Sequence, residues 1–77
     1  MAAETGFVAG IDLGATKILA VIFDRGMKAR AQAKVKTPGS GSADQVLASI
    51  LSALDSALAE LGMRRNDLEG IGVAVPS

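Results

Sequence analysis

Cysteine and histidine are both absent from this sequence of 77 residues. Without cysteine the chain has no disulfide bond, no thiol nucleophile and no thiolate zinc site. Without histidine it has no imidazole metal ligand, no Ser-His or Cys-His pair and no side chain whose ordinary pKa lies near neutral pH. Most hydrolase and zinc chemistry is therefore excluded for these residues.

The sequence also lacks an excess of either charge and any long hydrophobic run. The 8 basic residues balance the 8 acidic residues, so electrostatics gives no reason to expect binding to DNA or RNA. No apolar run is long enough to span a bilayer, and residues 1–5 have neither the basic nor the apolar region of a signal peptide. We therefore expect a cytoplasmic protein with no nucleic-acid or membrane partner.

Apolar residues, by contrast, are abundant. They make up 49% of the chain, and the mean hydropathy is +0.37. A chain of this size hides only about 60% of its surface on folding, and its core supplies about 3–5 kcal/mol of net stability at most. This much apolar surface on so short a chain predicts part of a larger folded body.

The first half of the chain predicts three strands. Residues 7–13 and 17–24 are apolar and rich in β-branched side chains, which is typical of strands buried on both faces. Their short connection predicts an antiparallel hairpin, and residues 24–26 predict a turn in which Gly26 tolerates positive φ. Residues 27–36 alternate alanine or valine with basic side chains, which predicts an edge strand blunted by lysines, with a small inner face that a helix can approach closely.

The second half predicts a helix and a final strand. Ser42 and Gln45 fit a capping box for a helix from Ala43, and Gly62 fits the glycine that follows a helix end. The helix carries leucine or isoleucine at three- and four-residue spacing, at positions 47, 50, 51, 54, 58 and 61. We interpret this as a core-facing stripe, because a dimer zipper needs more heptads. Residues 71–75 predict a strand, which the helical crossover makes parallel to an earlier one.

The hairpin between the first two strands is the candidate site. Its residues are Asp12, Gly14, Ala15, Thr16 and Lys17. Small residues expose backbone amides that can donate to phosphate oxygens, Lys17 adds positive charge, and Asp12 can hold Mg²⁺ through water. In the alternative interpretation, Asp12 and Thr16 only satisfy turn backbone. The spacing does not fit the P-loop or the dinucleotide-binding glycine motif.

Several features follow one another along the chain: the stretch GIDLGATKILAVIFD, the alternating basic strand, the TPG turn, the capped helix and IGVAVPS. Together they resemble the N-terminal segment of the ROK family, which comprises sugar kinases and repressors of the actin/hexokinase-like ATPase superfamily. The resemblance covers nearly the whole chain. The family's first phosphate motif is Asp-x-Gly-x-Thr followed by Lys, which the chain matches with Asp12, Gly14, Thr16 and Lys17. Ala15 and Ser77 stand where the family usually has glycine.

The resemblance implies an α/β fold: residues 1–77 as the incomplete N-terminal part of a ribonuclease H-like, actin/hexokinase-type ATPase domain. It has three antiparallel strands, a crossover helix and a fourth strand parallel to the first, in the sheet order 3-2-1-4. It also implies that residues 12 and 14–17 bind the phosphates of ATP and that Asp12 holds Mg²⁺. The intact protein would take ATP and a sugar. The segments that carry the family's catalytic base and sugar pocket are not encoded here, so we expect no catalytic residue in this chain and no kinase activity from the chain alone.

The resemblance leaves more than one function open. It is compatible with a glucokinase-like sugar kinase or, alternatively, with the effector domain of a sugar-responsive repressor. A repressor would carry a helix-turn-helix before the first strand, whereas only Met1 to Gly6 precede it here, which favours the kinase. In either case the chain would be a fragment whose last strand exposes an apolar edge, so we expect self-association or a homo-oligomer through that edge.

Overall fold

The computed structural model describes residues 6–39 and 42–74. Its elements in chain order are β1 (Val8–Leu13), β2 (Lys17–Phe23), β3 (Ala29–Lys36), α1 (Ala43–Ala59), a 3-10 turn (Arg65–Asp67) and β4 (Gly70–Ala74). Residues 1–5, Ser40 and Gly41 of the predicted turn, and residues 75–77, which include the predicted end of the last strand, lie outside the described residues.

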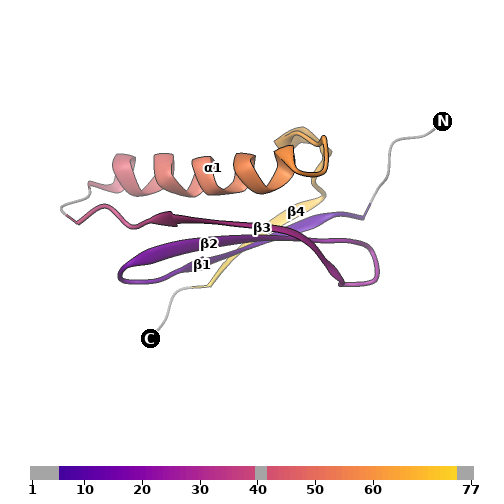
Figure 1. Cartoon of the computed structure of the whole chain (residues 1–77), viewed down its shortest axis with the longest axis horizontal. Helices are drawn as coiled ribbons and strands as arrows, with labels where there is room; N and C mark the ends of the chain where they lie inside the picture. Colours follow the sequence, from indigo (N-terminus) through magenta and orange to yellow (C-terminus); the bar gives the residue numbers. More distant parts are fainter. Residues whose placement is uncertain (1–5, 40–41, 75–77) are drawn as a thin grey trace.

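The strands form one 4-stranded sheet in the order β3-β2-β1-β4. β1 pairs with β2, and β2 with β3, in antiparallel fashion, whereas β4 is parallel to β1. α1 lies along one face of this sheet (Figure 1). The predicted α/β partial domain, its sheet order and its lysine-bearing edge strand are confirmed.

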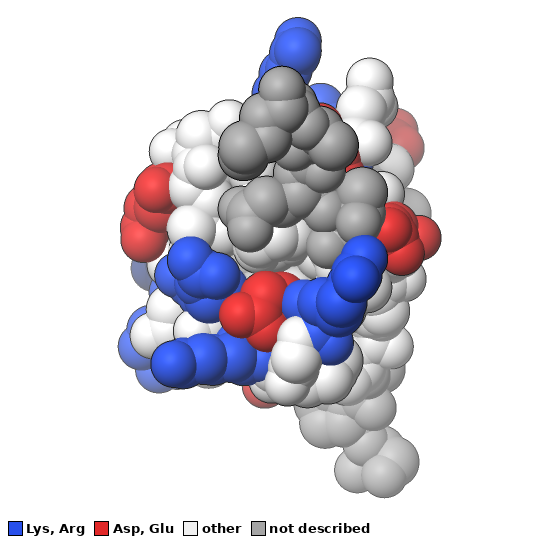
Figure 2. All heavy atoms as spheres, turned by 90° about the vertical axis from the view of Figure 1, so that its right-hand side faces the viewer, with Lys and Arg blue, Asp and Glu red and all other residues white. Residues whose placement is uncertain are grey.

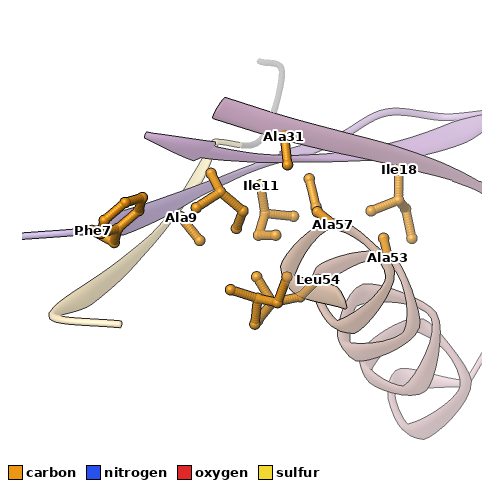
Figure 3. Close-up of a cluster of buried hydrophobic side chains, with 11 residues drawn as sticks. Phe7, Ala9, Ile11, Ile18, Ala31, Ala53, Leu54 and Ala57 are labelled. Atoms are coloured by element: carbon orange, nitrogen blue, oxygen red, sulfur yellow. The ribbon is translucent and has the colours of Figure 1, made fainter. Parts of the chain in front are cut away.

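The core lies between α1 and the sheet. Ile11 and Ile18 from the sheet and Ala53 and Leu54 from the helix belong to one buried cluster between the two layers (Figure 3). Alanine contributes on both sides, with Ala31 on β3 and Ala57 on α1, so the helix can approach the edge strand closely. Among the residues that the structure describes, the buried ones are Phe7, Ala9, Ile11, Ile18, Ala20, Ile22, Ala31, Ala53, Leu54, Ala57 and Leu58.

The face of the sheet away from α1 is not covered by any described residue, so the prediction that β1 and β2 are buried on both faces is wrong for this chain. Alternate residues of β2, such as Val21 and Phe23, remain partly exposed, and Asp12 of β1 is exposed. The apolar sequence did not reveal this, because both faces of these strands carry apolar side chains. Only the position of α1 determines which face of the sheet is buried.

The predicted leucine stripe is buried only in part. Leu54 and Leu58 are buried, but Leu47 is 55% exposed. Leu47 lies two helical turns before Leu54 and therefore on the same face of the helix. Its exposure follows from its position along the helix, where no described residue covers it.

Both ends of α1 are capped. The backbone N–H of Gln45 donates to Ser42 Oγ at 3.3 Å, as the capping motif predicts. At the other end, the N–H of Met63 donates to Leu58 O at 3.0 Å, and the N–H of Gly62 donates to Ala59 O at 3.1 Å. With φ of +66° at Gly62, this is a Schellman motif, and the predicted role of Gly62 is confirmed.

Gly62→Ala should destabilise the fold by about 1 kcal/mol, because a side chain with Cβ is strained at positive φ. No atom lies within 4 Å of the added methyl group, so the loss would come from the backbone alone. Gly72→Ala is the matched control, since Gly72 also has open space around it and no positive φ. Denaturant titration of both variants checks this, and equal midpoints for the two would contradict it.

The predicted turn between β2 and β3 is present, with its positive φ on Met27, at 64°, and not on Gly26, the residue that would tolerate it. The Asp24 carboxylate holds the turn by accepting from the N–H of Gly26 at 2.9 Å and of Lys28 at 3.0 Å. These hydrogen bonds, above all the one from Lys28, lower the pKa of Asp24. The nearby Arg30 side chain lowers it further. A carboxylate that organises the backbone in this way can support a non-glycine residue in the left-handed region.

The end of the molecule that carries this turn is rich in charge of both signs (Figure 2). Ion pairs at this end join Asp24 to Arg30 at 3.4 Å and Asp55 to Arg65 at 3.0 Å. Their side chains are partly exposed, so each pair adds little stability. This end is opposite the hairpin between β1 and β2 (Figure 1), and the candidate site is therefore remote from it.

In residues 6–39 and 42–74, no helix combines the length and the apolar character that crossing a membrane requires.

β4 forms the outer edge of the sheet opposite β3, and its side chains Ile71 and Val73 are 51% and 54% exposed. We therefore expect the isolated 77-residue chain to self-associate through this edge. Light scattering over a range of concentrations should show a rising mass for the parent chain. Val73→Lys should reduce that rise, because a charge on the edge disfavours pairing. A monomer at every concentration would contradict the expectation.

Candidate phosphate-binding site

The connection between β1 and β2 is a tight turn held by its own backbone. The N–H of Gly14 donates to Lys17 O at 3.1 Å. A Cβ built on Gly14 would lie 2.9 Å from that same oxygen, which is closer than real Cβ contacts, so a larger residue would push the loop out of this shape. Glycine at position 14 is thus required by a close backbone approach.

Thr37, directly after β3, braces the loop from the neighbouring strand. Its Oγ1 donates to Gly14 O at 3.0 Å, and its N–H donates to Thr16 O at 3.0 Å. Sequence reasoning placed Thr37 only in a turn and missed this role. The contact depends on the register of β2 with β3, in which Lys17 lies opposite Lys36, and that register brings the next residue of β3 beside Thr16.

Asp12 is exposed near the end of β1, where it lies between Leu19 of β2 and Ala74 of β4. The prediction that residues 7–13 are buried on both faces fails at Asp12, because this residue is exposed to solvent. No hydrogen bond or ion pair joins its side chain to another residue in the described part of the chain. The carboxylate is therefore accessible to a ligand.

The other predicted residues are placed at the tip and the following stem. Ala15, Thr16 and Lys17 are all exposed. Because Ile11 and Ile18 are buried under α1, the alternation along each strand puts Asp12 and Lys17 on the opposite face of the sheet. Asp12 and Lys17 thus lie on one face of the sheet, at the end of the hairpin that also carries Thr16 and a turn of small residues.

The site offers one carboxylate. Within the described residues, there is no group of three or more acidic side chains that could hold a metal ion by protein ligands alone. Mg²⁺ usually keeps several waters and binds through one or two carboxylates together with substrate phosphates. Asp12, which is exposed and has no partner among the described residues, lies next to a tight turn and fits that manner of binding.

No protein-family model matches this chain, and no curated protein sequence matches it.

Solved structures do resemble it. A glycerol dehydratase reactivase matches with a TM-score of 0.75 and 27% identity over 88% of this chain. A ROK family glucokinase from Streptomyces griseus, in complex with glucose and AMPPNP, matches with a TM-score of 0.61 and 30% identity over 91% of this chain. A reductive activator for corrinoid, iron-sulfur protein, at 16% identity and a TM-score of 0.70 over 97% of this chain, shows the fold alone.

The chain spans only a small part of these proteins: 12% of the reactivase, 20% of the glucokinase and 15% of the reductive activator. They are proteins of the actin/hexokinase-like ATPase fold, and the ROK glucokinase is one among several. The mixed sheet with its crossover helix matches the corresponding part of that fold. The chain is therefore a partial domain of the actin/hexokinase-like ATPase fold, a fold that binds nucleotides.

Proposed function

We propose that this chain is the phosphate-binding part of an ATP-dependent sugar kinase, with residues 1–77 forming the N-terminal part of its ATPase domain. The hairpin of residues 12–17 binds the phosphates of MgATP, and the sugar pocket and catalytic base are contributed by the rest of the protein. The glucokinase neighbour, at 30% identity and bound to glucose and AMPPNP, supports this proposal. The Asp-x-Gly-x-Thr-Lys sequence of the loop supports it further.

The observation that carries the proposal is that the groups that hold the turn are different from the side chains that are exposed around it. Backbone groups and Thr37 hold the turn, while the side chains of Asp12 and Thr16 make no hydrogen bond with a described residue. In the alternative interpretation these two side chains would be occupied in bonding the turn backbone. They are instead left exposed around a turn that is already formed, as a preorganised binding site requires.

Each residue has a distinct task in this proposal. The amides of Ala15 and Thr16 and the Thr16 hydroxyl would donate to phosphate oxygens, and Lys17 would add a positive charge. Asp12 would hold Mg²⁺ through water, and the ion when bound neutralises charge on the transferring phosphoryl group. Phosphoryl transfer depends mainly on such positioning and charge stabilisation. The proton of the sugar hydroxyl needs a base, which this chain leaves to the remaining protein.

Two other functions would use the same loop. One is the effector domain of a ROK-type sugar-responsive repressor, which the family resemblance also allows. The other is a dehydratase reactivase, which the TM-score of 0.75 to the glycerol dehydratase reactivase favours. The dependence of ATP turnover on a sugar distinguishes the kinase from these two functions. The complete protein should release ADP from MgATP only when a suitable hexose is present, and ATP turnover that is independent of every hexose would exclude the kinase.

Lys17→Ala in the complete protein should raise the KM for MgATP about tenfold or more, with a smaller change in kcat, because a lysine contact to phosphate is present in the ground state as well as in the transition state. Lys28→Ala is the matched control, since Lys28 is also exposed but lies at the other end of the sheet. Steady-state kinetics with ATP varied at saturating sugar checks this. Equal KM values for the two variants would count against a phosphate-binding hairpin.

A further inference from the structure

A second lysine lies beside the candidate loop. Lys36, the last residue of β3, is directly opposite Lys17 of β2. Just beyond them, the N–H of Thr37 donates to Thr16 O at 3.0 Å. Because hydrogen-bonded and non-hydrogen-bonded pairs alternate along an antiparallel ladder, Lys17 and Lys36 form a non-hydrogen-bonded pair, the kind whose side chains are closer. Their Cβ atoms are therefore about 4.5–5.5 Å apart.

The two lysines share the face that carries Asp12. The residues next to them, Ile18 and Val35, are directed toward the core under α1, so the alternation along each strand directs Lys17 and Lys36 to the opposite face. Both are exposed, and neither forms an ion pair with any residue of the described segments. Like charges directly opposite each other in a sheet are destabilising. In the ligand-free chain this pair therefore works against folding.

Protection of the sheet edge does not explain this arrangement. β3 also carries Arg30 and Lys34, which blunt the edge without lying opposite another cation: Lys34 is opposite Leu19. A bound polyphosphate would replace the repulsion between the two lysines with a net attraction, since each lysine is then attracted to the anion between them. Thr37, which follows Lys36, is hydrogen-bonded to the loop on both sides of its tip, so the position of Lys36 relative to the loop is defined.

We propose that Lys36 is a second phosphate-binding residue and that Lys17 and Lys36 together clamp the polyphosphate of the nucleotide. This inference rests on the proposed function and assigns a ligand contact to the edge strand, outside the Asp-x-Gly-x-Thr-Lys loop. It predicts that the clamp recognises the phosphate chain alone, independently of the base and ribose of the nucleotide.

The test is calorimetric binding to the complete protein, with MgATP, inorganic tripolyphosphate and adenosine as separate probes. Lys36→Met should weaken binding of MgATP and tripolyphosphate about tenfold and leave adenosine binding unchanged. Lys36→Arg, which keeps the charge, should stay close to the parent. Lys28→Met, the same substitution at the other end of the sheet, should have no effect. Equal affinities for Lys36→Met and Lys28→Met would overturn the proposal, and so would an equal loss with Lys36→Arg.

A second measurement distinguishes a binding role from a structural one. Removing one of two opposed charges should leave the unfolding midpoint of the ligand-free protein unchanged or raise it. A clear drop in the midpoint for Lys36→Met would overturn the proposal, because it would show that Lys36 stabilises the fold. Lys17→Met separates this inference from the proposed function. If Lys17→Met weakens MgATP binding and Lys36→Met does not, only the clamp is wrong, whereas no effect from either variant rejects the phosphate-binding hairpin itself.

Discussion

Asp12→Ala in the complete protein should lower kcat for phosphoryl transfer by about 10²-fold or more, while the KM for sugar changes little. Asp12 is exposed on the same face of the sheet as Lys17, and no described residue pairs with its carboxylate. In the proposed function it links Mg²⁺ to the transferring phosphate, an interaction that is strongest as charge develops in the transition state. The sugar pocket lies in other segments, so sugar affinity should be nearly independent of this residue.

Steady-state kinetics with sugar and ATP varied separately would measure this effect. Asp12→Asn keeps the size of the side chain and removes its charge, so it should lose nearly as much kcat as the alanine variant. Asp44→Ala, which removes another exposed aspartate, at the start of α1, should leave kcat unchanged. A kcat for Asp12→Ala within a few-fold of the parent would mean that the hairpin is only a turn.

Leu54→Ala should abolish cooperative folding of the 77-residue chain. Leu54 is 1% exposed at the centre of the helix face that covers the sheet. Truncation of a buried leucine costs about 2–5 kcal/mol through lost burial and the cavity left behind. A core of this size supplies about 3–5 kcal/mol in all, so the loss is comparable to the whole stability of the fold.

Leu47→Ala is the matched control for this prediction. It makes the same substitution in the same helix, but Leu47 is 55% exposed, and its truncation should change the free energy of unfolding by about 0.5 kcal/mol or less. Denaturant titration followed by circular dichroism would compare the two variants with the parent. Similar midpoints for Leu54→Ala and Leu47→Ala would show that the helix does not depend on this face for its stability.

The sequence alone determined the features that depend on neighbouring residues. The alternation of alanine and lysine before Lys36 predicts an edge strand, because a strand places successive side chains on opposite faces. Ser42 and Gly62 define the two ends of the helix, because caps satisfy backbone groups within a few residues. The order of Asp12, Gly14 and Thr16 identifies the candidate loop for the same reason: a tight hairpin brings adjacent residues together.

Only the tertiary structure decided which surfaces are covered and which residues of distant segments meet. Asp12 is exposed because α1 covers the other face of the sheet, and Leu47 is exposed because nothing in the described chain lies over its end of α1. The bracing of the loop by Thr37 and the pairing of Lys17 with Lys36 follow from strand register. Register and the covering of a face are set by contacts between residues far apart in the chain, so no local pattern of side chains specifies them.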